Sequence, residues 1–371
     1  MGTLSSYPSL DIYGAGAFGR QIADLLRANG QRIRYVYDRS PSETSRTYFK
    51  STHGVELLSA LEMPDQSPDV PILNCCFNAG VSNKELNAII VKAGREPLSP
   101  NRFYRELSHN AKDWNYWLDD AQNLTSSFGE IQKVRDWLQD DKSKSLWSDV
   151  CEFRIGDWKS EPKIDSAKQY FPLDLPALCF SEDLRMIDMG ACTGDALLNA
   201  IESGMSVKSY LCFEPDIDNI KKLKEEALRH VKNEKCMILP LGCSDEVSVS
   251  RFSASGSTSS RALREGESSD NQTLITIVTT DLDSVLIESF KPNLIKMDIE
   301  GFELKALKGS LNTIRVFKPT IAMAAYHNSM DLIDFMHYIE SEEAFSGYQW
   351  NIRQHGWNSL ETVLYGIPVH S

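Results

Sequence analysis

Apolar and polar positions in the first hundred residues alternate between strand and helix patterns. Residues 10–13 predict a short strand, and residues 17–29 carry apolar side chains at helical spacing, with Gly30 at the end. Further strands are predicted at residues 33–37 and 70–77, and a further helix at residues 84–93. Strand–helix–strand order predicts a parallel sheet with right-handed crossovers.

The same alternation returns from Leu184 onward. Strand patterns lie at residues 185–189, 209–213, 236–240, 293–298 and 320–325, and a closing pair of strands is predicted at 348–352 and 361–367. Residues 253–270 are rich in Ser and Gly, which predicts a mobile loop. Such a loop would be able to close over a bound substrate as a lid. The polar side chains that would contact the substrate are those of Ser257, Ser259, Ser260 and Arg261.

The stretch between these two regions differs in composition, because it holds five of the seven tryptophans. Ile131, Val134, Trp137 and Leu138 fall on one helical face, so we interpret the stretch as a helical connector whose aromatic residues pack between two domains. The predicted organisation is α/β, with a Rossmann-like nucleotide-binding domain at residues 1–100, the connector at 101–180 and a second Rossmann-like domain at 181–371.

Length and charge narrow the class of protein. A chain of 371 residues suggests roughly two domains. The net charge of −13 argues against binding to nucleic acid or to an anionic membrane, since both require a basic surface. The sequence shows neither an apolar run of about 18 residues nor an export signal, so we expect a cytoplasmic protein. The eight cysteines form no CxxC pair, and we expect them to be reduced.

A first glycine turn, with Gly14, Gly16 and Gly19, follows the first strand and opens the first helix. Such a turn leaves helix N–H groups free for a diphosphate, and Asp38 ends the next strand, where an acid would bind ribose hydroxyls. The turn is compatible with a dinucleotide, with a nucleotide-sugar or with no ligand. Hydride transfer is disfavoured because so short a domain leaves little room for a nicotinamide.

A second glycine turn lies in the C-terminal region, at residues 187–195 (IDMGACTGD). Polar clusters end the next strands at Glu214, at Ser244-Asp245 and at residues 296–301 (KMDIEG). Parallel strands bring such clusters to one crevice, where a carboxylate can accept both ribose hydroxyls of a nucleoside. This arrangement predicts a class I S-adenosylmethionine (SAM) methyltransferase fold with a mostly parallel seven-stranded sheet. The alternative is a sugar-nucleotide-binding sheet with unrelated acidic strand ends.

These motifs resemble the FkbM family of SAM-dependent methyltransferases, most specifically through residues 295–310 (IKMDIEGFELKALKGS). A subset of that family has a preceding Rossmann-type domain and a Gln-Tyr-Phe-Pro segment, here at residues 169–172. The resemblance implies O-methylation, often of a sugar hydroxyl in polysaccharide or natural-product biosynthesis. The SAM-contacting positions that we expect are Tyr170, Asp188, Gly190, Ala191, Gly194, Asp195, Glu214, Pro215, Ser244, Asp245 and Asp298. Cys192-Thr193 and Ala324-Ala325 depart from the family's usual residues, and the latter leaves acceptor specificity open.

Methyl transfer to a sugar hydroxyl needs a base or a metal beside that hydroxyl. Our hypothesis is that His327, just after the fifth strand, is the base and that Asp298 assists it; a histidine merely hydrogen-bonded at the strand end is the alternative. Glu300 is a candidate for acceptor binding, or an acid favoured by a helix N-terminus. A divalent metal held by these residues is compatible with the sequence but not favoured.

Arg353 and His355 lie among aromatic residues on the closing strands, a mixture that binds sugars, although solvent-facing edge residues would look the same. The expected partners are a small-molecule or glycan hydroxyl acceptor and a nucleotide-sugar at the N-terminal domain; a homo-oligomer is compatible with the sequence. The alternative function is a nucleotide or dinucleotide sensor with a catalytically silent second sheet.

Overall fold

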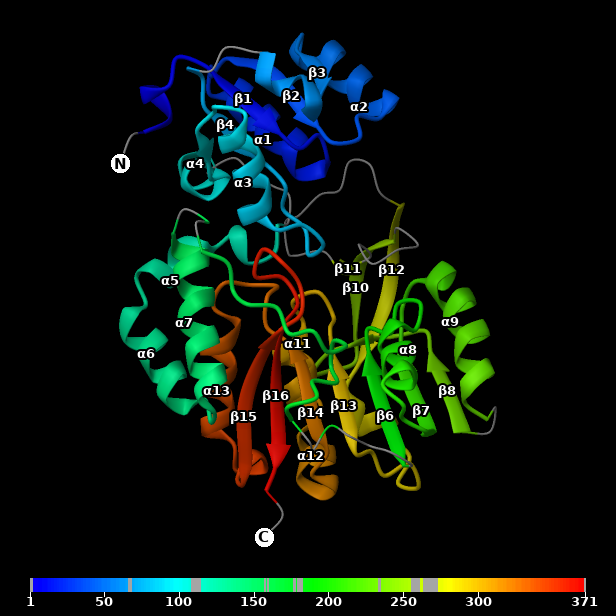
Figure 1. The fold of residues 1–371 in the computed structure, drawn as a ribbon. Coiled ribbons are helices and arrows are strands. Elements are labelled where there is room, and N and C mark those ends of the chain that lie inside the picture. Colours follow the sequence, from blue (N-terminus) through cyan, green and yellow to red (C-terminus); the bar gives the residue numbers. More distant parts are fainter. Residues whose placement is uncertain are drawn as a thin grey trace. The chain divides into compact units, whose positions relative to one another are not determined.

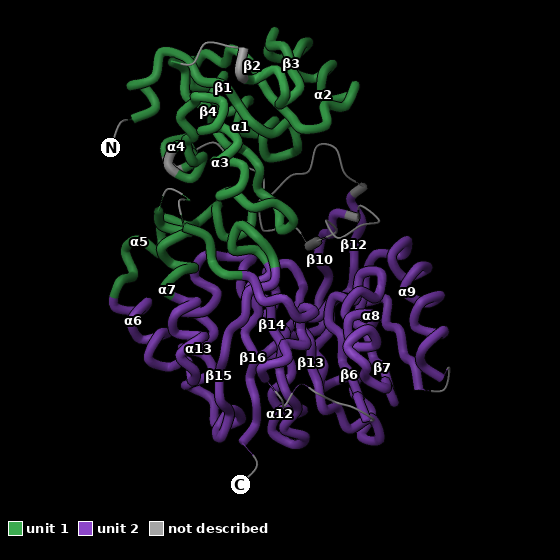
Figure 2. Tube along the Cα trace, viewed as in Figure 1, with its two compact units in different colours: residues 1–128, 148–163, 356–360 green, residues 129–147, 164–355, 361–371 purple. Residues whose placement is uncertain are grey.

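The structure is a computed structural model that describes residues 3–65, 69–107, 115–156, 158, 160–175, 178, 183–232, 235–254, 261–262 and 273–369. The chain forms two compact units (Figure 2). Unit 1 comprises residues 1–128, 148–163 and 356–360, and unit 2 comprises residues 129–147, 164–355 and 361–371. Among the described residues, no helix is long and apolar enough to cross a membrane.

Unit 1 is built on a five-stranded sheet of order β3-β2-β1-β4-β5, in which neighbouring strands are parallel. The strands are β1 (Leu10–Tyr13), β2 (Ile33–Asp38), β3 (Glu56–Ser59), β4 (Ile72–Asn74) and β5 (Pro97–Leu98). The helices are α1 (Ala17–Ala28), α2 (Glu43–Tyr48), α3 (Asn83–Lys92) and α4 (Pro100–Leu107). The predicted strands and helices are present, and β3 and β5 were missed because such short runs carry little periodicity.

The aromatic-rich helical segment is divided between the two units. It contains α5 (Ala121–Thr125), α6 (Phe128–Trp137) and α7 (Asp141–Ile155). Trp117, Phe153 and Trp158 pack together within unit 1, whereas Trp137 stacks on Trp350 within unit 2 at 5.5 Å between ring centroids. These aromatic contacts therefore belong to the cores of the individual units.

Unit 2 contains a seven-stranded sheet of order β15-β16-β14-β13-β6-β7-β8 (Figure 1). Its strands are β6 (Leu184–Met189), β7 (Val207–Phe213), β8 (Cys236–Leu239), β13 (Leu294–Met297), β14 (Thr320–Ala324), β15 (Tyr348–Gln354) and β16 (Thr362–Pro368). All pairs are parallel except those of β16 with β14 and β15. The strand order reverses between β6 and β13, so a ligand crevice is expected at their carboxyl ends.

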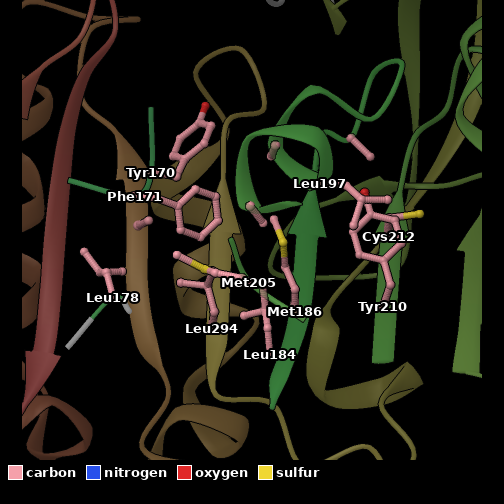
Figure 3. Packing of buried hydrophobic residues seen from close by; sticks show 14 of the residues in the cluster. Tyr170, Phe171, Leu178, Leu184, Met186, Leu197, Met205, Tyr210, Cys212 and Leu294 are labelled. Atoms are coloured by element: carbon pink, nitrogen blue, oxygen red, sulfur yellow. The ribbon is translucent and has the colours of Figure 1, made fainter. Parts of the chain in front are cut away.

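Six α-helices lie between the strands in the part of unit 2 that the structure describes. They are α8 (Asp195–Glu202), α9 (Ile217–His230), α10 (Leu282–Val285), α11 (Glu303–Lys308), α12 (Leu311–Phe317) and α13 (Asp331–Ser341). The apolar residues of α8 and α9 face inward, where Leu197 and Leu223 join Met186 and Tyr210 of the strands in one buried cluster. Tyr170 lies at one end of this cluster, and its hydroxyl points away from the cluster (Figure 3).

A second, mainly antiparallel sheet of order β11-β10-β12-β9 was not predicted. It contains β9 (Gly242–Cys243), β10 (Ser248–Ala254), β11 (Arg261–Ala262) and β12 (Thr273–Thr280). Strands β10 and β12 pair along seven residues, from Ser248 opposite Thr279 to Ala254 opposite Thr273. The Ser- and Gly-rich loop that we predicted lies between these strands, and apart from residues 253–254 and 261–262 it falls outside the described residues.

Candidate active site

A cavity of about 610 Å³ opens within unit 2 at the carboxyl ends of β6, β7 and β13. Its lining includes five residues that the sequence singled out: Gly190, Glu214, Pro215, Asp298 and Glu300. The remaining lining residues are Cys192, Phe213, Asn219, Leu241, Gly242, Cys243, Phe252, Ile277, Thr279, Ile299 and Phe302. Several of these come from β9, β10 and β12, so the sequence analysis missed them together with that sheet.

The glycine turn after β6 forms the cavity floor by close backbone approach. Gly190 has a φ of 78°, and a Cβ atom there would overlap with the carbonyl oxygen of Asp298. Lys296 is buried beneath the turn, where its Nζ lies 2.9 Å from Oδ1 of Asp188 and donates to the carbonyl oxygen of Gly190 at 2.6 Å. Only a residue without a side chain fits at position 190.

Asp188 does not reach the cavity wall, although we expected it to contact SAM. It is fully buried, and Tyr210 donates its hydroxyl to Oδ2 at 2.7 Å while Lys296 pairs with Oδ1. Asp188 therefore holds the turn from below. Ala191, Gly194 and Asp195 are likewise absent from the cavity lining. Gly194, at φ 100°, serves instead as the residue before α8.

Glu214 follows β7 and presents its carboxylate to the cavity. The backbone N–H of Cys192 donates to Oε2 at 2.8 Å, and the N–H of Asp216 donates to Oε1 at 2.8 Å. The side chain of Asn219 also hydrogen-bonds to this carboxylate. An ionised carboxylate offers about four acceptor positions, so these three donors leave about one position for a ligand. Burial raises the pKa of Glu214, while these backbone donors oppose the rise.

Ser244 and Asp245 lie just beyond the cavity rather than in it. The N–H of Ser244 donates to the carbonyl oxygen of Thr280 at 2.9 Å, and its hydroxyl donates to Asp245 at 3.0 Å. The wall on this side is made by Leu241, Gly242 and Cys243, directly before Ser244. The contact of Ser244 and Asp245 with SAM therefore stays a prediction, and the residues directly before them line the cavity.

Asp298 follows β13 and accepts hydrogen bonds from two tyrosines. Tyr170 donates to Oδ2 at 2.6 Å, and Tyr326 donates to Oδ1 at 3.2 Å. Tyr170 is buried with φ 72° and is absent from the cavity lining, so it positions Asp298. Burial, with the Asp298 charge adding to it, raises the pKa of Tyr170 well above its ordinary range.

His327 is completely buried behind the acidic cavity wall. Its Nδ1 lies 2.9 Å from Oε1 of Glu303, and its Nε2 lies 3.4 Å from Oδ1 of Asp298 and 3.5 Å from Oε2 of Glu300. Burial disfavours the charged imidazolium, but the three carboxylates outweigh burial and raise the pKa of His327 to about 10. Glu303 was not singled out from the sequence, although the motif residues 295–310 contain it.

Arg353 and His355 are structural residues rather than cavity residues, contrary to the expectation of acceptor binding. Arg353 is 1% exposed, and its guanidinium pairs with Asp140 at 2.7 Å and with Asp174 at 2.9 Å. His355 contacts the hydroxyl of Tyr365 at 2.8 Å, and burial lowers the pKa of His355 to about 4. Neither residue lines the cavity described above.

The glycine turn of unit 1 has the geometry of a nucleotide-binding turn. Gly14 has φ 108°, and a Cβ atom at Gly19 would overlap with the carbonyl oxygen of Gly14. Asp38 accepts the N–H of Ala15 at 2.8 Å and the N–H of Ser40 at 2.8 Å. The Asp38 carboxylate therefore helps to close the turn, as well as standing where a ribose would bind.

The seven described cysteines form no disulfide. Four of them, at positions 75, 151, 212 and 243, are buried, and burial raises the pKa of each of these thiols. Buried neutral thiols behave as small apolar residues. The expectation of reduced cysteines thus agrees with the structure.

The strand order and the cavity at the β6–β13 switch point define a Rossmann-like methyltransferase fold. Residues 188–350 match the family model of the methyltransferase FkbM domain. A crystal structure of a methyltransferase FkbM from Methylobacillus flagellatus KT has the same fold, with a TM-score of 0.72 at 23% identity, over 97% of this chain and 90% of that one. The N-terminal domain of human METTL16 has a TM-score of only 0.34 at 11% identity, over 68% of this chain and 94% of that one. No curated protein sequence matches the chain.

Residues 188–350 of the protein therefore match a methyltransferase FkbM domain, as their motifs indicated, and this match indicates a methyltransferase. The two-part α/β organisation, with a five-stranded parallel sheet in unit 1 and a seven-stranded sheet in unit 2, is confirmed.

Proposed function

We propose that this protein transfers a methyl group from SAM to a hydroxyl group of a sugar, in polysaccharide or natural-product biosynthesis. The observation that carries the donor assignment is the Glu214 carboxylate at the cavity wall. Its two oxygens are held by the backbone N–H groups of Cys192 and Asp216 and by the side chain of Asn219, which leaves about one acceptor position for a ligand. A ribose hydroxyl would fill this position.

The cavity as a whole suits a nucleoside with a charged tail. Phe252, Ile277 and Leu241 supply apolar surface for a base, while Asp298 and Glu300 supply negative charge at another part of the wall. A sulfonium is positive, so this acidic part of the wall favours the donor electrostatically.

SAM supplies an activated methyl carbon, so the protein must chiefly align the donor and the acceptor. The acceptor oxygen forms a bond to this carbon, the carbon–sulfur bond breaks with its electron pair on sulfur, and the hydroxyl proton passes to the Asp298 carboxylate at the cavity wall. We propose that Asp298 and His327 act on this hydroxyl. Asp298 lines the cavity, while His327 lies behind it, 3.4 Å away through Nε2.

The acceptor assignment rests on fewer residues. Glu300 remains a candidate to bind acceptor hydroxyls, because it lines the cavity and its side chain is 18% exposed. With Arg353 and His355 bound elsewhere, the groups that select a particular sugar must come from other residues. The FkbM family supports the methyltransferase assignment, and the sugar hydroxyl is our extension of it.

A nucleotide-sensing role for unit 1 is the second candidate function. It is favoured by the turn at Gly14, Gly16 and Gly19, which leaves Gly16 with open space around it. A diphosphate could approach the backbone there. We propose a nucleotide-sugar as the ligand, in keeping with a sugar acceptor in unit 2.

Titration of the purified protein with SAM, NAD and UDP-sugars tests these assignments. We expect SAM affinity to fall by about 10–100-fold in Glu214→Ala, because a buried hydrogen bond between the donor and a charged group is lost. Asp195→Asn is the matched control, since Asp195 is an acid of the same glycine turn that lies outside the cavity lining. NAD binding without SAM binding would instead support the sensor.

A further inference from the structure

We propose that Asp298, Glu300 and His327 form a binding site for one divalent metal ion at the cavity wall, with Glu303 orienting the imidazole from behind. The three ligand atoms would be Oδ1 of Asp298, Oε2 of Glu300 and Nε2 of His327. The existence of this site does not depend on the identity of the acceptor. Its role in methyl transfer rests on the function proposed above.

The spacing of the ligand atoms fits a metal ion. Nε2 of His327 lies 3.4 Å from Oδ1 of Asp298 and 3.5 Å from Oε2 of Glu300. Ligands that hold an ion at about 2.1 Å lie roughly 3.0–3.4 Å from one another, depending on the angle at the metal. These separations exceed ordinary N–H···O hydrogen bonds, which are about 2.9–3.0 Å long. Glu300 lies outside the group of mutually close ligand atoms, which Asp298, Glu303 and His327 form, so an ion would enter once the partly exposed Glu300 side chain turns toward Asp298.

Glu303 supplies the support that a metal-binding histidine requires. Its Oε1 lies 2.9 Å from Nδ1 of His327, and the N–H of Ile299 donates to the same oxygen at 2.7 Å. A carboxylate that accepts the Nδ1 proton leaves Nε2 as the coordinating atom and fixes the plane of the ring. Suitable ligand atoms of Asp298, Glu303 and His327 all lie within 4.8 Å of one another.

The charge around His327 also calls for a cation. Three carboxylates, from Asp298, Glu300 and Glu303, surround a single imidazole that is completely buried. Even a fully charged imidazolium would balance only one of them. The nearby Lys296 is occupied by Asp188 and by the carbonyl oxygen of Gly190. Charges in a poorly solvated site are costly unless they are paired or coordinate a metal, so a divalent ion would stabilise this group.

The donor set points to an ion of the Mn²⁺ or Mg²⁺ type. Two carboxylate oxygens and one imidazole nitrogen would leave coordination positions open on the cavity side, where Asp298 and Glu300 are exposed. A hydroxyl oxygen bound at such a position would lose its proton more easily. The departing proton would then pass to solvent or to the second carboxylate oxygen of Glu300.

Titration of the chelator-treated, full-length protein with Mn²⁺ tests the site, with free Mn²⁺ followed by electron paramagnetic resonance. We expect one Mn²⁺ per chain, with affinity reduced by more than about 100-fold in His327→Gln and in Glu300→Gln, and by about 10–100-fold in Glu303→Gln. His230→Gln is the matched control, because its Nε2 pairs with Glu226 at 3.0 Å on the exposed surface. That variant should bind Mn²⁺ like the unaltered protein.

Two further measurements separate this proposal from the proposed function. Circular dichroism shows which variants are folded. If His327→Gln does not fold, Glu300→Gln still tests the metal site, because Glu300 is partly exposed and its substitution should leave the fold intact. SAM titration of the same samples reports on the donor site alone. Stoichiometric Mn²⁺ binding that requires His327 and Glu300 supports the site whether or not SAM binds. SAM binding without saturable Mn²⁺ binding, or Mn²⁺ binding unaffected by Glu300→Gln, would overturn it.

Discussion

Glu214 and Asp298 are both carboxylates at strand ends, but the structure surrounds them with different donors. Glu214 is held by backbone N–H groups of Cys192 and Asp216, so its orientation follows directly from the course of the chain. Asp298 is held by the hydroxyl groups of Tyr170 and Tyr326. Its orientation therefore depends on side chains that the fold brings together from segments far apart in the sequence.

His355 should make stability depend on pH. Burial lowers its pKa from 6.5 to about 4, with Asp165 partly opposing and Lys142 and Arg353 reinforcing the shift. The unfolded chain therefore binds the proton first on acidification, and folding free energy is lost as the pH falls from about 6.5 to about 4. We expect His355→Asn to reduce this acid-induced loss by about 2–3 kcal/mol, as measured by urea unfolding at several pH values. Parallel pH profiles for the two proteins would refute this.

At the scale of elements, the two glycine turns share one construction. In each, the chain leaves a central parallel strand and turns into a helix with a glycine at positive φ, namely Gly14 at 108° and Gly190 at 78°. The backbone atom that leaves no room for a Cβ atom differs between the turns. At Gly190 it is the carbonyl oxygen of Asp298, and at Gly19 it is the carbonyl oxygen of Gly14 in the same turn. Both turns therefore exclude a side chain for reasons of packing, independently of any ligand.

Gly19→Ala should destabilise unit 1 by about 3 kcal/mol or more, because the added methyl group overlaps with the backbone carbonyl of Gly14. Gly16→Ala is the matched control, since nothing lies within 4 Å of a Cβ atom at that position. We expect it to change the free energy of unfolding by less than about 1 kcal/mol. Urea unfolding measures both. If Gly16→Ala is folded but loses nucleotide-sugar affinity, the turn binds the ligand's diphosphate.

Arg353 links strand β15 to the segment between α6 and α7 and to the segment that precedes β6, through Asp140 and Asp174. We expect Arg353→Ala to lower the free energy of unfolding by about 1–3 kcal/mol while SAM affinity is retained, because the arginine is buried, its carboxylate partners are partly exposed, and neither ion pair lines the cavity. Lys142→Gln removes an exposed cation beside Asp174 and should cost less than about 1 kcal/mol. If Arg353→Ala folds but loses SAM affinity, Arg353 contributes to the SAM site and the purely structural role is wrong.

At the scale of the molecule, the two units contain one parallel sheet each, but the chain does not divide into consecutive domains. Residues 148–163 and 356–360 belong to unit 1, although unit 2 supplies the residues on either side. In unit 1, Asn358 and Ser359 are fully buried, and Trp117 donates its indole N–H to the carbonyl oxygen of Asn358 at 2.9 Å. Such long-range insertions leave no compositional boundary in the sequence.

Local sequence predicted the strands of both sheets well, because apolar periodicity reflects which face of each element is buried. It also located Gly190, Glu214 and Asp298, since they directly follow strands whose carboxyl ends must meet. It failed for β9–β12, because β9 and β11 are only two residues long and because β10 and β12 flank the Ser- and Gly-rich stretch that we interpreted as a loop. It therefore also missed Phe252, Ile277 and Thr279 of the cavity. It failed too for Asp188, since a buried acid and an exposed one look alike in sequence.

The sequence on its own thus predicted the parallel α/β fold, the strand ends that bear polar residues, and the resemblance to FkbM methyltransferases. Each of these depends on patterns within a few consecutive residues. Tertiary structure alone decided that Lys296 neutralises Asp188, that Arg353 is enclosed by acids, and that Glu303 lies behind His327. The physical reason is that the charge and accessibility of a side chain depend on what surrounds it. These neighbours are brought together only when the sheet is assembled.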